Sequence, residues 1–243
     1  MPPFSANWAF FLDIDGTLFD IAETPDAVRT GRADNKVIAT LREAAAGAVA
    51  LVSGRSLAAI DELVPLNLPA SGQHGVERRD AQGRVRRAPF PVEALQRAVG
   101  GIREFAAKHD GLVFENKGYC VALHYRLAPQ LAGAAHRVVR EAAARIGDQV
   151  EVMGGKMVAE LKPAGRNKGI AIEEFMREAP FAGRTPVFLG DDVTDEQGFE
   201  VVNRLGGHTV KVGEGPTAAR WRLKGPAEVR AWLRAWIGHA AGR

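Results

Sequence analysis

Three short apolar runs, each followed by small polar or acidic residues, constrain the fold of this chain more than any other feature. They are Trp8–Ile14, Ala48–Val52 and Pro186–Leu189. Apolar runs of this length that end at turn residues are typical of buried strands. Helical periodicity follows the second run at 56–63 and the third run at 196–203. This alternation predicts an α/β fold, in which a parallel sheet is covered by helices on both faces.

The middle of the chain follows a different pattern. Two amphipathic segments each precede a pair of short alternating strands, which indicates an α+β arrangement. The expected helices are Val92–Lys108 and Pro129–Ile146, and the expected strands are Leu112–Glu115, Tyr119–Tyr125, Val150–Met153 and Met157–Leu161. We therefore expect residues 84–162 to form a domain inserted into a core that is built from residues 1–83 and 163–243.

The composition is typical of a soluble globular protein and narrows the compartment. The 243 residues carry a formal net charge of +3, and 46% of them are hydrophobic. The single cysteine, Cys120, cannot form an internal disulfide, which favours a reducing compartment. The sequence contains no readable secretory signal and no uncharged apolar run of about 18 residues. We expect a cytoplasmic monomer with no membrane partner.

Two carboxylates, Asp13 and Asp15, lie at the end of the first apolar run, in the sequence DIDGTL. Ligands of open α/β sheets bind beyond the carboxyl ends of the strands. Two anions this close repel each other unless a cation or a shared proton intervenes, and oxygen ligands suit Mg²⁺. A capped Asp-Gly turn is the alternative, which the preceding strand makes the weaker interpretation.

A second acidic cluster, Gly190–Glu196, follows the third apolar run. Its Asp191 and Asp195 would complete a metal site at the same edge of the sheet. The alternative is that Asp192 and Thr194 cap the helix that follows, since both residue types favour that position. Taken alone, the cluster fits both interpretations equally well.

Two further elements fit an anionic ligand. Ser53 and Gly54 follow the second apolar run and offer a hydroxyl and an amide to a phosphate group. Lys168 opens a predicted helix, where the helix dipole disfavours a cation unless an anion shares the site. An ordinary Ser-Gly turn and an exposed lysine are the alternatives.

In chain order, these elements resemble the four motifs of the haloacid dehalogenase superfamily phosphatases. The motif residues are Asp13 with Asp15, Ser53, Lys168, and Asp191 with Asp195. The resemblance implies that Asp13 is the nucleophile that attacks phosphorus and forms an aspartyl-phosphate. It implies that Asp15 is the general acid for the leaving oxygen and then the base that activates water, with Lys168 as the third catalytic residue.

The same resemblance implies a Mg²⁺ site and a phosphate site. The implied metal residues are Asp13, Asp15 through its backbone carbonyl, Asp191 and, in a supporting position, Asp195. The implied phosphate contacts are Thr17, Ser53, Gly54 and Lys168. These groups would neutralise the charge on the transferring phosphoryl group.

Longer motifs narrow the resemblance. They are Gly72–Glu77, Glu115–Lys117, Ala122–Arg126, Gly155–Pro163 and Gly190–Glu196. Together they resemble the trehalose-6-phosphate phosphatases, in particular the bacterial single-domain enzymes. The resemblance implies a haloacid-dehalogenase-like Rossmannoid core with an inserted C2-type α/β cap domain that binds the sugar. The implied sugar contacts are Glu115, Lys117, Arg126, Lys156 and Glu160.

The function implied by the resemblance is Mg²⁺-dependent hydrolysis of trehalose 6-phosphate to trehalose and phosphate, the last step of trehalose biosynthesis. Four alternatives stay open. The substrate is another sugar phosphate; the chain is a silent phosphosugar-binding module; Glu115 and Lys117 form only a surface ion pair; or the basic segment Arg78–Arg87 binds nucleic acid. We favour a small-molecule substrate and no nucleic-acid partner, because such a segment is more often a solvated hairpin rim.

Overall fold

The computed structural model describes residues 1–24, 27–28, 31–90 and 92–242 and contains two compact units. Unit 1 comprises Met1–Arg86 and Asn167–Arg243, and unit 2 comprises Arg87–Arg166. The limits expected from the sequence, 84 and 162, fall three and four residues before those of unit 2, 87 and 166. Past the expected second limit, Lys162 Nζ donates to the carbonyl of Arg166 at 2.5 Å, a contact within unit 2.

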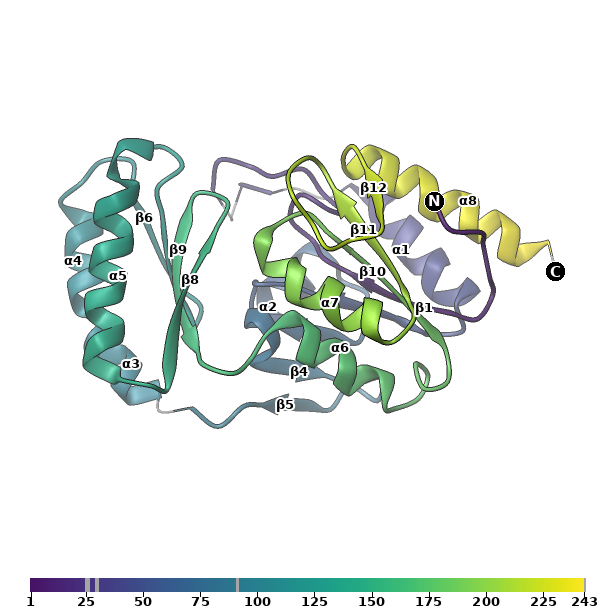
Figure 1. The fold of residues 1–243 in the computed structure, drawn as a ribbon, viewed down its shortest axis with the longest axis horizontal. Coiled ribbons are helices and arrows are strands. Elements are labelled where there is room, and N and C mark those ends of the chain that lie inside the picture. Colours follow the sequence, from purple (N-terminus) through teal and green to yellow (C-terminus); the bar gives the residue numbers. More distant parts are fainter. Residues whose placement is uncertain (25–26, 29–30, 91, 243) are drawn as a thin grey trace. The chain divides into compact units, whose positions relative to one another are not determined.

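Unit 1 is built on a sheet of eight strands (Figure 1). In spatial order they are β12 (Trp221–Leu223), β11 (His208–Val212), β10 (Thr185–Gly190), β1 (Trp8–Leu12), β2 (Val49–Val52), β3 (Ala70–Gly72), β4 (Glu77–Arg79) and β5 (Val85–Arg87). The pairs from β12 to β3 are parallel, and β4 is antiparallel to β3. The predicted α/β fold with a mostly parallel sheet is confirmed.

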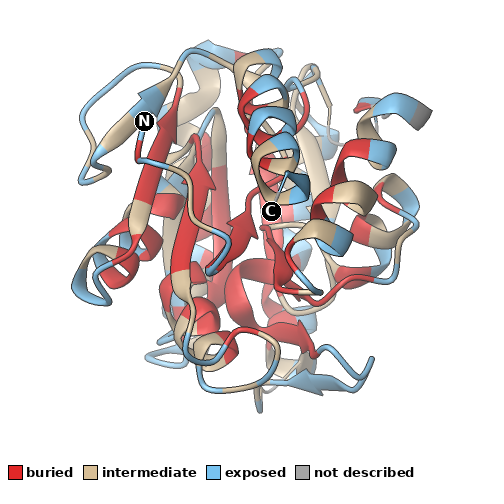
Figure 2. Ribbon diagram, turned by 90° about the vertical axis from the view of Figure 1, so that its right-hand side faces the viewer, coloured by how far each residue is buried: buried red, intermediate tan, exposed pale blue. Residues whose placement is uncertain are grey.

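Helices cover both faces of this sheet because its strands are apolar on both faces. The helices of unit 1 are α1 (Arg32–Ala44), α2 (Leu57–Leu63), α6 (Lys168–Met176), α7 (Glu196–Arg204) and α8 (Pro226–Ala241). Phe10 of β1 packs in one buried cluster with residues of α1 and α8, while Phe11 packs in another with residues of α6 and α7. Figure 2 shows the central strands as buried. Within the described part of the chain, no helix is long and apolar enough to span a membrane.

Unit 2 is a four-stranded antiparallel sheet with helices packed on its apolar face. The sheet order is β6 (Val113–Asn116), β7 (Val121–His124), β9 (Val158–Pro163) and β8 (Val150–Gly155). The helices are α3 (Val92–Ala98), α4 (Gly100–Ala107) and α5 (Ala132–Ile146). The single helix expected over Val92–Lys108 is therefore two helices, which meet just before the glycine pair at 100–101.

The arginine-rich segment Arg78–Arg87 has a buried start and a solvent-exposed end. Arg78 and Arg79 are both buried. Arg78 Nε lies 3.2 Å from Glu174 Oε2, and two guanidinium nitrogens of Arg79 donate to the Asp61 carboxylate at 2.7 Å. The first two arginines are thus held by carboxylates inside unit 1, whereas Arg84, Arg86 and Arg87 are exposed, as expected for a solvated rim.

The aromatic cluster beneath α8 is expected to dominate the stability of unit 1. Trp236 is fully buried, and its ring stacks on that of Trp8, with 6.3 Å between the ring centroids. Its Nε1 donates to the Ser5 carbonyl at 3.0 Å. Trp236→Ala should lower the free energy of unfolding by about 3–5 kcal/mol in denaturant titrations. Trp221→Ala removes the same atoms from a half-buried position on the edge strand β12 and should cost clearly less. Equal losses in the two variants would contradict this assignment.

Candidate active site

Asp13 follows the end of β1 and is buried in unit 1. Its Oδ1 accepts a hydrogen bond from Lys168 Nζ at 2.8 Å, and Thr17 Oγ1 donates to its Oδ2 at 3.4 Å. The chain turns directly after it, at Gly16, whose φ is +76°. A Cβ atom at Gly16 would lie 2.1 Å from Asp191 Oδ2, so the turn requires a glycine for both its conformation and its space.

Lys168 joins two carboxylates across unit 1. It is the first residue of α6, where the side chain of Asn167 caps the helix by accepting from Ile170 N at 2.9 Å. Its Nζ donates to Asp13 Oδ1 at 2.8 Å and to Asp195 Oδ1 at 2.7 Å. Lys168 is thus buried, not exposed, and its ammonium group is paired with carboxylates of the protein itself.

The pKa values of this cluster reflect burial together with an excess of negative charge. Burial lowers the pKa of Lys168, but Asp13 and Asp195 outweigh it, so the pKa lies above its ordinary value and the side chain stays cationic at neutral pH. Burial raises the pKa of Asp13 well above its ordinary value; Asp195 and Asp191 raise it further, against the opposing effect of Lys168. One ammonium group does not neutralise three neighbouring carboxylates.

The loop after β10 is shaped by Asp195. Its Oδ2 accepts hydrogen bonds from the backbone N–H groups of Asp191 at 3.0 Å and Asp192 at 2.9 Å. Asp192 caps the short turn that follows, and its side chain accepts from Val193 N at 2.8 Å. The capping alternative thus applies to Asp192. Asp195 completes a capping box with Asp192 and, like Asp191, is also buried beside Asp13.

Three carboxylates of unit 1 fit a hard divalent cation. Asp13, Asp191 and Asp195 each offer an oxygen, and the three oxygens lie within 4.8 Å of one another. All three residues are buried, and oxygen donors of this kind suit Mg²⁺. Burial is the main cause of the raised pKa of Asp13, and a cation would offset the negative charge of Asp195 and Asp191 that raises it further. The carboxylate of Asp15 is not part of this group.

Asp15 has a partner that sequence reasoning missed. Arg55 Nε donates to its Oδ2 and Arg55 Nη2 to its Oδ1, both at 2.7 Å. This two-pronged pairing fixes the orientation of the carboxylate. Asp13 and Asp15 therefore have different partners, although they are only two residues apart. Arg55 comes directly after the Ser-Gly pair at the end of β2, and this position is the only signal of it in the sequence.

Ser53 and Asp13 each directly follow a strand, and they lie at the same edge of the sheet because β1 and β2 are parallel neighbours, with Leu12 in register with Leu51. Ser53 and Thr17 are both buried, and Ser53 Oγ accepts from Arg55 N at 3.1 Å. The predicted phosphate contacts Thr17, Ser53, Gly54 and Lys168 all belong to unit 1.

Lys211 is a second residue that sequence reasoning missed. It is buried in β11, its Nζ donates to the backbone carbonyl of Asp191 at 2.8 Å, and it lies 3.6 Å from Glu196 Oε1. A lysine within an apolar strand, HTVKV, was the available signal. Lys211 holds the backbone of the loop that carries Asp191.

The predicted sugar contacts of unit 2 form two groups. In the first, Lys117 Nζ donates to Glu160 Oε1 at 2.8 Å and lies 4.0 Å from Glu115 Oε2. The side chain of Glu115 is 30% exposed, whereas those of Lys117 and Glu160 are 10% and 5% exposed, so the closer ion pair of Lys117 is a buried one with Glu160. Burial lowers the pKa of Lys117, but Glu160 and Glu115 outweigh it and raise that pKa above its ordinary value.

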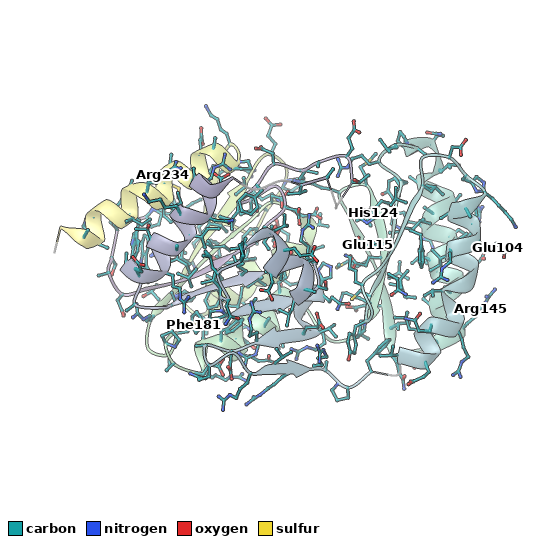
Figure 3. The ribbon with its side chains drawn as sticks, turned by 180° about the vertical axis from the view of Figure 1, so that it is seen from behind. Glu104, Glu115, His124, Arg145, Phe181 and Arg234 are labelled. Carbon is teal, nitrogen blue, oxygen red and sulfur yellow. The ribbon has the colours of Figure 1, made fainter. Side chains whose placement is uncertain are left out.

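His124 belongs to this first group. Its Nε2 lies 2.8 Å from Glu115 Oε2, and the two side chains are labelled in Figure 3. Burial raises the pKa of Glu115, but the hydrogen bond with His124 and the charge of Lys117 lower it by more, so that the pKa lies below its ordinary value. Glu115 is therefore held as an anion.

The second group lies at the other end of the β6–β7 hairpin. Arg126 follows β7, and its Nη2 donates to the backbone carbonyl of Lys156 at 3.0 Å. Lys117, in contrast, lies at the turn of the hairpin. It follows Asn116 at the end of β6, which pairs with Val121 at the start of β7. The structure thus joins Arg126 to the turn that carries Lys156 and joins Lys117 to Glu160.

Comparisons with known proteins agree with this geometry. The sequence model of the family described as trehalose-phosphatase matches residues 11–227. The trehalose-6-phosphate phosphatase of Escherichia coli K12 is 46% identical over 234 residues, which are 96% of this chain and 87% of that protein. A probable trehalose-phosphate phosphatase of Sinorhizobium fredii is 45% identical over 85% of this chain and 78% of its own length.

Solved structures are similar as well. A trehalose-6-phosphate phosphatase related protein has a TM-score of 0.83 at 29% identity, covering 96% of this chain and 98% of its own. The C-terminal domain of a Candida albicans trehalose-6-phosphate phosphatase has a TM-score of 0.86 at 24% identity, covering 96% of this chain and 93% of its own, and supports the fold alone. Because the family model spans most of the chain, and relatives match it at more than 40% identity, the chain belongs to the trehalose-phosphatase family, as its motifs predict.

Proposed function

We propose that this protein hydrolyses trehalose 6-phosphate to trehalose and phosphate, the last step of trehalose biosynthesis, through an aspartyl-phosphate. The observation that carries the proposal is the buried Asp13 carboxylate, held 2.8 Å from Lys168 Nζ within a cluster of three carboxylates. A nucleophile next to a fixed ammonium group and a hard-cation site is the arrangement that phosphoryl transfer requires.

The first step is the transfer of the phosphoryl group to Asp13. A carboxylate oxygen of Asp13 forms a bond to phosphorus, while the bond from phosphorus to the sugar oxygen breaks. Asp15 donates a proton to that leaving oxygen, which releases the sugar as an alcohol. Arg55 holds both oxygens of Asp15, so one of them must be freed before the proton is delivered.

The second step is hydrolysis of the acyl-phosphate. Asp15, now a carboxylate, takes a proton from water as the water oxygen bonds to phosphorus. The bond between phosphorus and the Asp13 oxygen breaks, which regenerates the carboxylate and releases inorganic phosphate. Asp13 forms the bond to phosphorus in the first step and releases it in the second, while Asp15 first donates a proton and then accepts one. Because Asp15 can activate water, the acyl-phosphate is hydrolysed.

Charge on the transferring group is met by residues of unit 1. Lys168 supplies a fixed positive charge, Ser53 and Thr17 supply hydroxyl groups, and Gly54 supplies a backbone amide. Mg²⁺, held by Asp13, Asp191, Asp195 and the backbone carbonyl of Asp15, would neutralise further negative charge on the phosphoryl oxygens. Lys211 keeps the Asp191 loop in place through the bond to its carbonyl.

Recognition of the sugar is assigned to unit 2, which in this proposal is the cap domain. Its first group presents Glu115, Lys117 and Glu160, whose charged atoms form strong, directional hydrogen bonds to hydroxyl groups. Arg126 and Lys156 form the second set of contacts. A site built from such groups rejects analogues that leave them unpaired.

A substrate panel tests the reaction and the substrate together. Phosphate release should be fastest by a wide margin from trehalose 6-phosphate, compared with sucrose 6-phosphate, glucose 6-phosphate and p-nitrophenyl phosphate. EDTA should abolish the release, and added Mg²⁺ should restore it, because the carboxylate cluster needs a cation. Metal-dependent release with another preferred sugar would retain the chemistry and replace the substrate. No release from any of the four would favour a silent binding module.

Asp13→Asn should lower kcat by at least about a thousandfold on every substrate, because the amide cannot form the acyl-phosphate. Asp20→Asn is the matched control, since Asp20 is exposed and seven residues away, and should leave kcat unchanged. Phosphate release is the measurement, and trapping of a phosphorylated protein by acid quenching should succeed only with Asp13 present. Substantial activity in Asp13→Asn would exclude this nucleophile.

Glu160→Ala should lower kcat/KM for trehalose 6-phosphate by about a hundredfold, because it removes a sugar contact and leaves Lys117 buried without its partner. The loss on p-nitrophenyl phosphate should stay within about threefold, since that ester has no sugar hydroxyl groups. Glu160→Gln keeps the shape of the side chain, so its kcat/KM for trehalose 6-phosphate should lie between those of the wild type and of Glu160→Ala. Equal losses on both substrates would remove unit 2 from sugar recognition.

A further inference from the structure

Three consecutive residues of unit 1 adopt a left-handed backbone conformation. They are Gln73, His74 and Gly75, with φ values of +48°, +57° and +96°. Only the third is a glycine, and left-handed conformations are uncommon for other residues. Such conformations persist where the surrounding structure enforces them, and they concentrate at functional sites. This segment lies within the motif Gly72–Glu77, to which the proposed reaction gives no role.

The left-handed segment lies along the loop that carries Ser53. The backbone N–H of His74 donates to the Ser53 carbonyl at 3.1 Å, and that of Gln73 donates to the Arg55 carbonyl at 2.8 Å. Farther along, Glu77 Oε2 accepts from Leu57 N at 3.1 Å. Residues 73–77 thus contact the Ser53–Leu57 loop at three points, namely Ser53, Arg55 and Leu57.

The same segment also approaches the helix that carries Lys168. A Cβ atom at Gly75 would lie 2.7 Å from the backbone carbonyl of Asn167, the residue that caps α6. The segment thus lies against both the loop of Ser53 and the start of α6, which carry two residues of the proposed phosphate site, Ser53 and Lys168. They lie 115 positions apart in the sequence (168 − 53).

The imidazole ring of His74 packs on Gly54. A Cβ atom at Gly54 would lie 2.7 Å from both Cε1 and Nε2 of the ring. His74 is 5% exposed. The ring therefore limits how the backbone at Gly54 can move, and the amide of Gly54 is one of the proposed phosphate donors.

We propose that His74 is a positioning residue of the phosphate site. Its ring holds Gly54, and its left-handed backbone holds Ser53, so that both donors meet the phosphoryl group in one geometry. The inference rests on the proposed phosphoryl transfer in unit 1, but not on the identity of the sugar. His74 acts through Gly54 and Ser53 and takes no part in bond making or breaking.

The test uses inorganic phosphate as the probe and p-nitrophenyl phosphate as the substrate, both with Mg²⁺. His74→Asn removes the ring but keeps a residue type that tolerates left-handed backbone. His208→Asn is the matched control, because His208 is half-buried against Trp8 at the N-terminal end of β11. Readouts are the inhibition constant of phosphate, KM, kcat, and the rise of the melting temperature with added phosphate.

His74→Asn should raise the inhibition constant of phosphate and KM by about tenfold, with a smaller change in kcat. Phosphate should also raise its melting temperature less than that of the wild type. The His208→Asn control should match the wild type in all four readouts. A phosphate inhibition constant unchanged in a folded His74→Asn variant, or no effect of phosphate on the wild type, would overturn the proposal.

A double-mutant cycle tests the contact itself. Gly54→Ala alone should weaken phosphate binding about tenfold, because the added Cβ displaces the His74 ring. In the His74→Asn background the ring is absent, so the same change should cost less than about threefold. Additive losses would overturn the proposal. Failure of trehalose 6-phosphate as a substrate would overturn the proposed function alone, because this cycle does not use that sugar.

Discussion

The placement of the Lys168 ammonium group between Asp13 and Asp195 is the interaction on which the architecture of unit 1 depends. The three residues come from α6, the end of β1 and the turn after β10, and they meet because β1 and β10 are parallel neighbours in register. The close turn at Gly16 and the bond from Lys211 to the Asp191 carbonyl complete the same arrangement. Sheet topology and site chemistry are therefore two aspects of one constraint.

The two units hold charge in different ways. The cluster of unit 1 has three carboxylates against one ammonium group, an imbalance that suits a cation and an anionic substrate. The first group of unit 2 sets Glu115 and Glu160 against Lys117, with His124 on Glu115. It has one carboxylate fewer against the same single ammonium group, and its side chains pair with one another, so that it suits neutral hydroxyl groups better than a metal. The division of labour proposed for the two units follows from this difference.

The sequence predicts what is local and misses what is assembled from remote segments. Asp13 and Asp191 could be found because each directly follows a buried strand. Arg55 and Lys211 could not, because their partners lie 40 and 20 residues away in the chain. The strands β3, β4, β5 and β12 have three residues each, too few for a periodic signal. The expected strands Val150–Met153 and Met157–Leu161 leave the glycine pair 154–155 in the turn between them. In the structure this pair belongs to β8, and the left-handed residue of the turn is Met157.

The pairing of β1 with β10 also dictates an order of assembly. Trp8 is in register with Thr185, so the central pair of the sheet closes only after most of the chain is available. Unit 2, in contrast, is continuous from Arg87 to Arg166 and can fold from local contacts. Once folded, it shortens the effective loop that the β1–β10 pairing must close. During synthesis, Asp13 is therefore made early but stays without Lys168 and Asp195 until the C-terminal segment joins the sheet.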